Sequence, residues 1–296
     1  MAKYREIRSR IQGVDNTAKI TQAMKMVSAA KLRRAQDAII AARPYGEKLR
    51  EMLQFLAANV DSTVSPLLEQ RPVGRVCLVI VTADRGLCGA FNSNVIKSAL
   101  SLIKGELQPF AAHGRLDLVC IGKRCVDFFA KREFNVIANY AGILNALDFS
   151  VAQQIVSMLS TGFLSQQYDR VIVLHNEFKS AVKQNVVQVQ LLPVPKIESA
   201  DPQGAISPQL DYIFEPSRDE ILDALLPKHL NTQMWNMLLD SNAAEQGARM
   251  AAMENATKNA KDLVKALRRS YNRARQTAIT TEILEIVSGA EALKSQ

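Results

Sequence analysis

Each end of the chain contains a long stretch that favours a single helix. Proline interrupts residues 3–58 once, at Pro44, and no proline follows Pro227. Apolar or small side chains recur at alternating steps of three and four, the spacing of one helix face. They include Ile7, Ile11, Val14 and Ala18 near one end and Val264, Leu267, Tyr271, Ala274 and Ala278 near the other. Helices of ~70–90 Å follow from a rise of 1.5 Å per residue. Their apolar stripes are too narrow for burial in a globular core, so we expect a long antiparallel coiled coil.

The middle of the chain has a different pattern, in which strand-like and helix-like segments alternate. The predicted strands are 75–82, 116–121, 135–140, 170–175 and 186–192, and the predicted helices are 91–104, 123–132 and 148–164. This alternation is typical of an α/β domain with a mainly parallel, Rossmann-like sheet. A further apolar helix, about 218–238, precedes the C-terminal helix or merges with it.

These patterns divide the chain into four segments. A run of prolines with Gly204 marks a linker before the C-terminal helix. The segments are a coiled-coil helix at 1–60, an α/β domain at 70–195, a linker or foot at 196–218 and a second coiled-coil helix at 219–290.

Positive charge is concentrated at the two ends of the chain. The formal net charge is +8; residues 1–58 hold 12 Lys/Arg against 5 Asp/Glu, and residues 241–296 hold 9 against 6. Such an excess favours an acidic partner: nucleic acid, anionic lipid or acidic protein loops. Nucleic-acid binders often interleave aromatic residues with basic ones, whereas here Tyr271 alone lies near the basic face. An acidic protein partner is therefore our first expectation, and a nucleic-acid-binding coiled coil is an alternative.

Residues 82–94, TADRGLCGAFNSN, connect a predicted buried strand to a predicted helix. Nucleotide-binding folds hold phosphate at such a turn, but this stretch has neither GxGxxG nor a P-loop. We expect Asp84 and Gly86 to shape the turn, and Asn92 or Ser93 to cap the helix. The alternative is a ligand site in which Arg85 binds phosphate and Asp84 binds a metal ion.

Other candidate catalytic residues do not form a known motif. The three histidines, His113, His175 and His229, are scattered, and there is no zinc-binding spacing of His or Cys. His175 is followed by Glu177 at a predicted strand end, so an acid–base role is an alternative to a structural one. A small-molecule enzyme would need polar groups to converge at the strand ends around Asp84, Asn94 and Glu177. We expect no metal and no cofactor.

Both ends of the chain are similar to one known family. IRSRIQGVDNTAKITQAMKMVSAAKLRRAQ resembles the N-terminal helix of the gamma subunit of F-type ATP synthases, and EQGARMAAMENATKNAKDLVKALRRSYNRARQTAITTEILEIVSGA resembles its C-terminal helix. TADRGLCGAFN and the run from LLPVP to FEP also look like that family. The chloroplast form carries a Cys-bearing insert after LLPVP; residues 196–211 have no Cys, so thiol control is not expected here.

The resemblance implies a central rotor stalk without an active site or a nucleotide of its own. Its coiled coil would turn inside the alpha-beta catalytic hexamer, driven by proton flow through the membrane c-ring. Further implied partners are the epsilon subunit and, within the complex, delta; nucleic acid is not among them. The implied location is peripheral, on the cytoplasmic face of the bacterial inner membrane or on the matrix side of the mitochondrial inner membrane.

The resemblance also assigns contact residues, motif by motif. Contacts with the alpha-beta hexamer would come from Met24 and Lys25 in QAMKMV, Arg249 in GARMAAM, and Arg275, Gln276 and Thr280 in RARQTAIT. The foot near the membrane ring would include Phe214 and Glu215 in IFEP.

Overall fold

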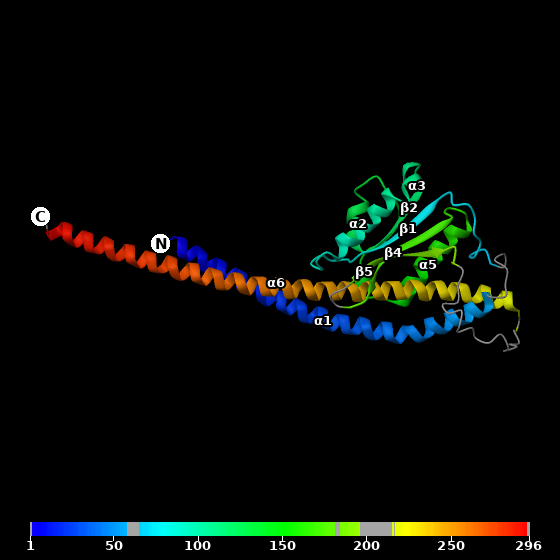
Figure 1. The fold of residues 1–296 in the computed structure, drawn as a ribbon, viewed down its shortest axis with the longest axis horizontal. Helices are drawn as coiled ribbons and strands as arrows, with labels where there is room; N and C mark the ends of the chain where they lie inside the picture. Colours follow the sequence, from blue (N-terminus) through cyan, green and yellow to red (C-terminus); the bar gives the residue numbers. More distant parts are fainter. Residues whose placement is uncertain (1, 58–64, 181–183, 196–214, 216, 295–296) are drawn as a thin grey trace. The chain divides into compact units, whose positions relative to one another are not determined.

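The computed structural model describes residues 2–57, 65–180, 184–195, 215 and 217–294 (Figure 1). Contacts divide the chain into two units, each of which is considered by itself. The terminal unit consists of Met1–Ser28 and Arg249–Gln296, and the α/β unit consists of Ala29–Ala248. Most of the predicted linker, 196–214 and 216, and the predicted foot residue Phe214 lie outside the described residues.

Two long helices contribute to both units. Helix α1 (Ala2–Ala57) continues through Pro44, and helix α6 (Arg218–Lys294) continues through Pro227. A proline inside a helix loses one backbone hydrogen bond, a cost that surrounding packing can offset. The apolar segment predicted at 218–238 is therefore the first part of α6 and not a separate helix.

A five-stranded sheet forms the centre of the α/β unit. Its strands are β1 (Val76–Val81), β2 (Leu116–Ile121), β3 (Asn135–Tyr140), β4 (Arg170–Phe178) and β5 (Gln184–Leu192). The order is β3-β2-β1-β4-β5, with parallel pairing from β3 to β4 and an antiparallel β5. All five predicted strands are confirmed, and so is the fold class, a mainly parallel α/β layer combined with long terminal helices.

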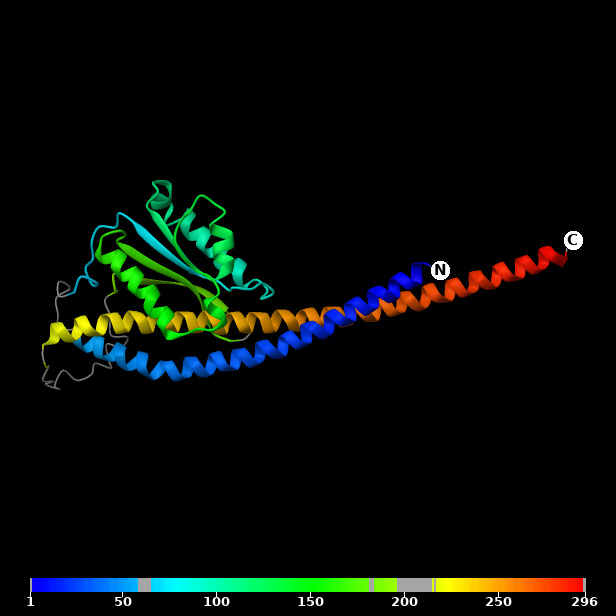
Figure 2. The ribbon, with the colours of Figure 1, turned by 180° about the vertical axis from the view of Figure 1, so that it is seen from behind.

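Helices cover both faces of the sheet (Figures 1 and 2). On one face lie α2 (Phe91–Lys104), α3 (Gln108–Ala112) and α4 (Lys123–Phe129). On the other face lie α5 (Phe149–Leu164), which follows the short 3-10 helix η1 (Ile143–Asn145), and parts of α1 and α6. The reverse view shows α5, in green, against the sheet (Figure 2). Buried apolar residues on the two faces form two separate clusters.

The predicted cap of α2 is wrong. Ala90 is the N-cap residue and makes no side-chain capping bond. The Asn92 side chain instead points back to the preceding loop, where its Oδ1 accepts from the Ala83 backbone N–H at 2.9 Å. The Ser93 hydroxyl donates to the carbonyl oxygen of Ala90 at 2.9 Å. Both side chains therefore bond to backbone groups that precede α2, and neither accepts from the free N–H groups of its first turn.

Candidate partner-binding surface

In the terminal unit, two polar contacts fix how α1 and α6 are aligned. The hydroxyls of Thr21 and Thr257 are hydrogen-bonded at 2.7 Å and are buried. Lys25 Nζ forms an ion pair with Glu254 Oε1 at 2.6 Å. Residue numbers rise along α1 as they fall along α6, so the two helices run antiparallel here, as predicted.

Among the residues that the structure describes, this alignment leaves the end of α6 without a partner helix. Because Thr21 lies opposite Thr257, the first residue of α1, Ala2, lies opposite about residue 276. Helix α6 continues to Lys294, so about 18 residues, or about 27 Å of helix, extend beyond the paired region. We call residues 277–294 the overhang.

The overhang exposes large apolar side chains. Ile279, Ile283, Leu284, Ile286 and Val287 are between 47% and 72% exposed. Single exposed apolar residues are common, but a contiguous group marks a surface that binds something else. The hydroxyls of Thr277, Thr280 and Thr281 each donate to the carbonyl four residues earlier in the helix. These three hydroxyls thus have acceptors within the helix, whereas the apolar side chains face solvent.

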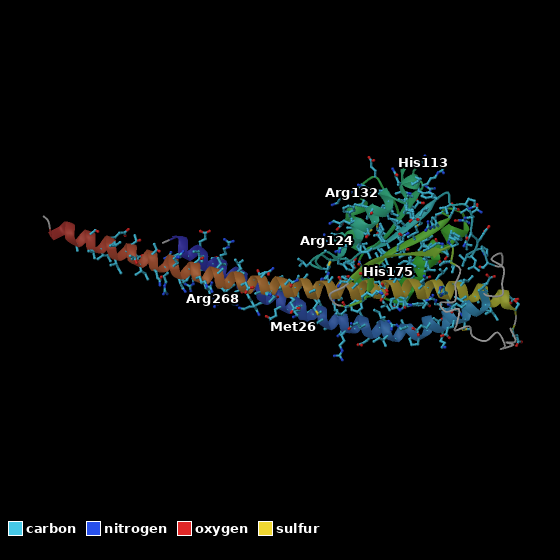
Figure 3. All side chains as sticks on the ribbon, viewed as in Figure 1. Met26, His113, Arg124, Arg132, His175 and Arg268 are labelled. Atoms are coloured by element: carbon cyan, nitrogen blue, oxygen red, sulfur yellow. The ribbon has the colours of Figure 1, made fainter. Side chains whose placement is uncertain are left out.

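A basic stretch precedes the overhang. The side chains of Arg268, Arg269, Arg273 and Arg275 are all exposed. Figure 3 shows Arg268 projecting from α6 and Met26, which is 62% exposed, on α1. The terminal unit therefore presents both positive charge and apolar groups to solvent, a combination suited to a partner with acidic loops and an apolar lining.

The predicted contact residues fall into two groups. Arg275, Gln276 and Thr280 are exposed and lie at the start of the overhang or just before it. Met24 is half-buried, and Lys25 is already paired with Glu254. Their contacts with other chains stay predictions.

The last two predicted contact residues, Arg249 and Glu215, differ from the others. Arg249 belongs to the terminal unit but is not openly exposed, and Glu215 belongs to the α/β unit. Arg249 is buried, with 9% exposure, so a partner would reach it only at its edge. Glu215 of the predicted foot is exposed, and its contact with a membrane ring is likewise untested.

In the loop after β1, one carboxylate accepts several backbone hydrogen bonds at the sheet edge. The Asp84 carboxylate accepts backbone hydrogen bonds from Lys123 at 2.9 Å, Gly142 at 2.7 Å and Leu144 at 3.2 Å. These donors follow β2 and β3, at the carboxyl edge where doubly wound folds bind phosphate. The chain's own carboxylate thus takes the hydrogen bonds that a phosphate would take, and it ties three loops together.

Close packing fills the rest of this edge. Gly122 has φ +89°, and a Cβ there would lie 2.1 Å from the carbonyl oxygen of Thr82. Ala244 of α6 packs against Ala83, Cys88 and Phe91 at the ends of the loop after β1. These contacts pack the two ends of the loop closely against neighbouring elements, as expected if TADRGLCG has a structural role.

The residues proposed for an enzyme do not converge. Asp84 is engaged with backbone amides, Asn94 is exposed on α2, and His175 is buried in β4. Burial lowers the pKa of His175 to about 4, and the nearby Glu177 opposes this shift, so the imidazole is neutral near pH 7. Within the described ranges no three His, Cys, Asp or Glu side chains form a group that could hold a metal ion.

A groove of about 580 Å³ lies elsewhere in the α/β unit, between α1 and α6. Its lining is largely polar and includes Arg43, Arg50, His229, Asn236 and Asp240. Burial lowers the pKa of His229, and Arg50 lowers it further. The groove does not include the loop after β1, so it is not a nucleotide crevice of the usual kind.

The chain combines an antiparallel pair of long helices, apolar and exposed at one end, with a mainly parallel α/β unit. The model of the ATP synthase family matches residues 3–293. The ATP synthase gamma chain of Prosthecochloris aestuarii is 51% identical over 295 residues and that of Chloroherpeton thalassium is 50% identical over 301, each alignment covering 99% of both chains. This chain belongs to the ATP synthase gamma-chain family.

Solved structures have the same fold. A chain of the Euglena gracilis mitochondrial ATP synthase (OSCP/F1/c-ring, rotational state 3) matches with a TM-score of 0.72 and 21% identity, covering 98% of this chain and 94% of that chain. A chain of the rotor of the same organism's enzyme, in rotational state 1, matches with a TM-score of 0.68 and 18% identity, covering 94% and 99%. Among the residues that the structure describes, no helix has an apolar stretch long enough to cross a membrane.

Sequence reasoning missed two features of the surface. The apolar face of the overhang was assigned to the coiled-coil seam, because the spacing of Ile279, Ile283 and Ile286 is the same for a seam and for a bearing surface. Leu87 is 66% exposed and has φ +65°. Large side chains are uncommon at positive φ, and an apolar residue between Gly86 and Gly89 was the sequence signal for an exposed loop tip.

Proposed function

We propose that the chain is the central rotor stalk of an F-type ATP synthase. The overhang and the coiled coil sit in the bore of a hexamer of alpha and beta subunits, and rotation of the chain couples proton flow through a membrane c-ring to ATP synthesis or hydrolysis. The observation that carries this proposal is the overhang: a helix end with a contiguous apolar surface and no partner helix, preceded by four exposed arginines.

The contact residues follow from this placement. Arg275, Gln276 and Thr280 touch the catalytic subunits near the top of the bore, which their exposure supports. Met24, Lys25 and Arg249 lie lower on the shaft and meet acidic loops of the beta subunits. Lys25 must then exchange its bond to Glu254 for a partner carboxylate, which is inexpensive because exposed ion pairs contribute little.

The α/β unit and the foot lie outside the bore. Phe214 and Glu215 are near the membrane ring, epsilon packs against this part of the stalk, and delta belongs to the same complex. The chain itself contributes no catalytic group. Its bacterial relatives support a peripheral position on the cytoplasmic face of the inner membrane; the matrix side of the mitochondrial inner membrane is the alternative.

Reconstitution tests the proposal directly. Purified alpha and beta subunits are mixed with and without the full chain, and assembly and the rate of ATP hydrolysis are measured. We expect the chain alone to be inactive, and a complex with one copy per three beta subunits to sustain hydrolysis. Failure to form a complex, together with nucleotide binding by the chain alone, would contradict the proposal.

A single substitution tests the predicted contact at the top of the bore. Gln276→Leu should weaken rotary coupling or assembly while leaving the chain folded, since the side chain is exposed. Circular dichroism checks the fold, and ATP-driven proton pumping of the assembled enzyme checks the coupling. Unchanged hydrolysis and pumping in the assembled variant would exclude this contact.

A further inference from the structure

The contact between α6 and β4 changes character along its length. Along its first part the two elements belong to one buried apolar cluster, which includes Val171 and Val173 of β4 and Met234, Met237 and Leu238 of α6. Alternate residues of a strand face the same side, so His175 and Glu177 continue this face of β4. On α6 the next residues are Asp240 and Ser241. These four residues, His175, Glu177, Asp240 and Ser241, form what we call the polar joint; Figure 3 shows His175 where the sheet adjoins α6.

The polar joint is less well satisfied than the apolar part. His175 and Ser241 are 4% and 1% exposed, yet His175 Nδ1 and Ser241 Oγ have no hydrogen-bond partner among the described residues. Buried polar atoms usually have partners, and leaving them without one costs free energy. The polar joint therefore stabilises the packing of α6 on β4 less than the apolar part does. A change of charge in the joint is expected to change the strength of this packing.

Asp240 is the group in the polar joint whose charge changes near neutral pH. Burial and, to a smaller extent, the nearby Glu177 raise the pKa of Asp240, Arg43 and Lys179 oppose the shift, and the resulting pKa is about 6. Lys179 also forms an ion pair with Glu177 at 3.0 Å. Asp240 lines the groove between α1 and α6 together with Arg43, so protons reach it from solvent without any opening of the fold.

We propose that the polar joint is a proton-sensitive contact: when Asp240 takes up a proton, a half-buried charge facing Glu177 is removed and α6 is held more firmly against β4. The ordinary pKa of an Asp carboxyl is 3.8, so between about pH 4 and pH 6 the folded chain binds a proton that the unfolded chain does not. This group stabilises the fold most at the acidic end of that window, and its contribution is lost as the pH rises through 6.

Two histidines near the joint do not produce the same effect. His175 has a pKa of about 4, lowered by burial from the ordinary histidine value of 6.5, so its neutral imidazole also costs the fold stability in acid. His229, which lines the same groove, has a pKa lowered by burial and by Arg50. A lowered histidine pKa makes the unfolded chain the better proton acceptor, so His229 destabilises the fold in acid. Both histidines therefore act with the opposite sign to Asp240, and only a comparison of variants separates the contributions.

The chain contains its own local reporter for this test. Its single tryptophan, Trp235, lies on α6 five residues before Asp240, and its ring meets Phe149 of α5 edge to face at 5.9 Å. Urea unfolding of the full chain, followed by Trp235 fluorescence, is measured at about pH 7.5 and about pH 5 for the native chain and Asp240→Asn. Asp223→Asn, an exposed position of the same helix, is the matched control.

Between these pH values we expect the unfolding constant of the native chain to fall on the order of tenfold further than that of Asp240→Asn. The Asp223→Asn control should follow the native chain. Equal pH dependence of Asp240→Asn and the native chain would overturn the proposal.

A second measurement on the native fold covers the case in which Asp240→Asn does not fold. Carbon-13 NMR of the Asp240 carboxyl group should give a titration midpoint near 6 in the native chain. Glu177→Gln should lower that midpoint, because it removes the facing negative charge. A midpoint at the ordinary Asp value of 3.8 would overturn the proposal without any stability measurement.

Discussion

The α/β unit and the terminal unit place similar residues in opposite environments. In the α/β unit the sheet and its covering helices bury large apolar side chains completely, among them Phe129, Leu159 and Phe163. In the terminal unit the buried seam between α1 and α6 consists largely of small or polar residues, including Ala18, Thr21, Ser28, Thr257 and Ala260, while isoleucines of the overhang face solvent. One unit uses its apolar surface to stabilise itself. The terminal unit buries only a narrow seam and leaves apolar side chains exposed, where we propose that other chains bind.

The largest difference between the units should appear when one buried and one exposed aliphatic side chain are truncated. Leu159→Ala should lower the free energy of unfolding by about 2–5 kcal/mol, because it leaves a cavity in a fully buried cluster. Ile283→Ala, at an exposed position, should change it by no more than about 0.5 kcal/mol. Urea unfolding of the full chain measures both. Similar losses from the two substitutions would remove the distinction.

The next effect concerns the carboxyl edge of the sheet. Asp84→Ala leaves three backbone N–H groups without their acceptor and should cost roughly 1–3 kcal/mol. Asp148→Ala is the control, since Asp148 accepts from one backbone N–H, that of Ser150, at the start of α5. Thermal unfolding should show a larger loss for Asp84→Ala. The reverse order would mean that Asp84 does not hold the three loops together.

A smaller effect is expected in the seam of the terminal unit. Thr21→Val or Thr257→Val alone removes the hydrogen bond between the helices and leaves the other hydroxyl with only the carbonyl of its own helix, which should cost about 1 kcal/mol. The double variant should lose less than the sum of the two, because both polar groups are then absent. A double-mutant cycle measures this coupling. Additive losses would show that the 2.7 Å hydrogen bond does not align the helices.

The smallest effect should come from the ion pair of the seam. Lys25→Gln breaks the pair with Glu254, but both side chains are substantially exposed, so stability should change by about 0.5 kcal/mol or less. If Lys25 meets acidic partner loops, the same variant should assemble more slowly with alpha and beta subunits, and most clearly at low salt. A stability loss as large as that of Leu159→Ala would place Lys25 in the structural core of the shaft.

Local pattern was sufficient to predict most elements of the fold. The buried strand Val76–Val81 is a continuous apolar run, and α2 begins and ends where its 3.6-residue period predicts. The prediction that Asn92 caps α2 was wrong because its Oδ1 instead accepts a hydrogen bond from the backbone N–H of Ala83 in the preceding loop. Short polar side chains bond to whichever backbone group the local loop offers.

The functional surfaces were harder to predict, since they depend on distant residues. Nothing near Asp84 in the sequence indicates that its carboxylate accepts from the backbone N–H groups of Lys123, Gly142 and Leu144, which only the parallel sheet brings together. Likewise, a three–four repeat shows that a helix has an apolar face but not what covers it. The overhang became recognisable only when the Thr21–Thr257 bond fixed the alignment of the two helices.

Cysteine labelling of the overhang tests the central claim most directly. All four native cysteines are buried, so a cysteine introduced by Ile283→Cys should react with a maleimide far faster than they do. After assembly with alpha and beta subunits its labelling should slow strongly, whereas a cysteine introduced by Ile137→Cys, on the exposed edge strand β3, should keep its rate. If Ile283→Cys labels equally fast in the assembled complex, the overhang is not the surface that the partners cover, and the account of the shaft is wrong.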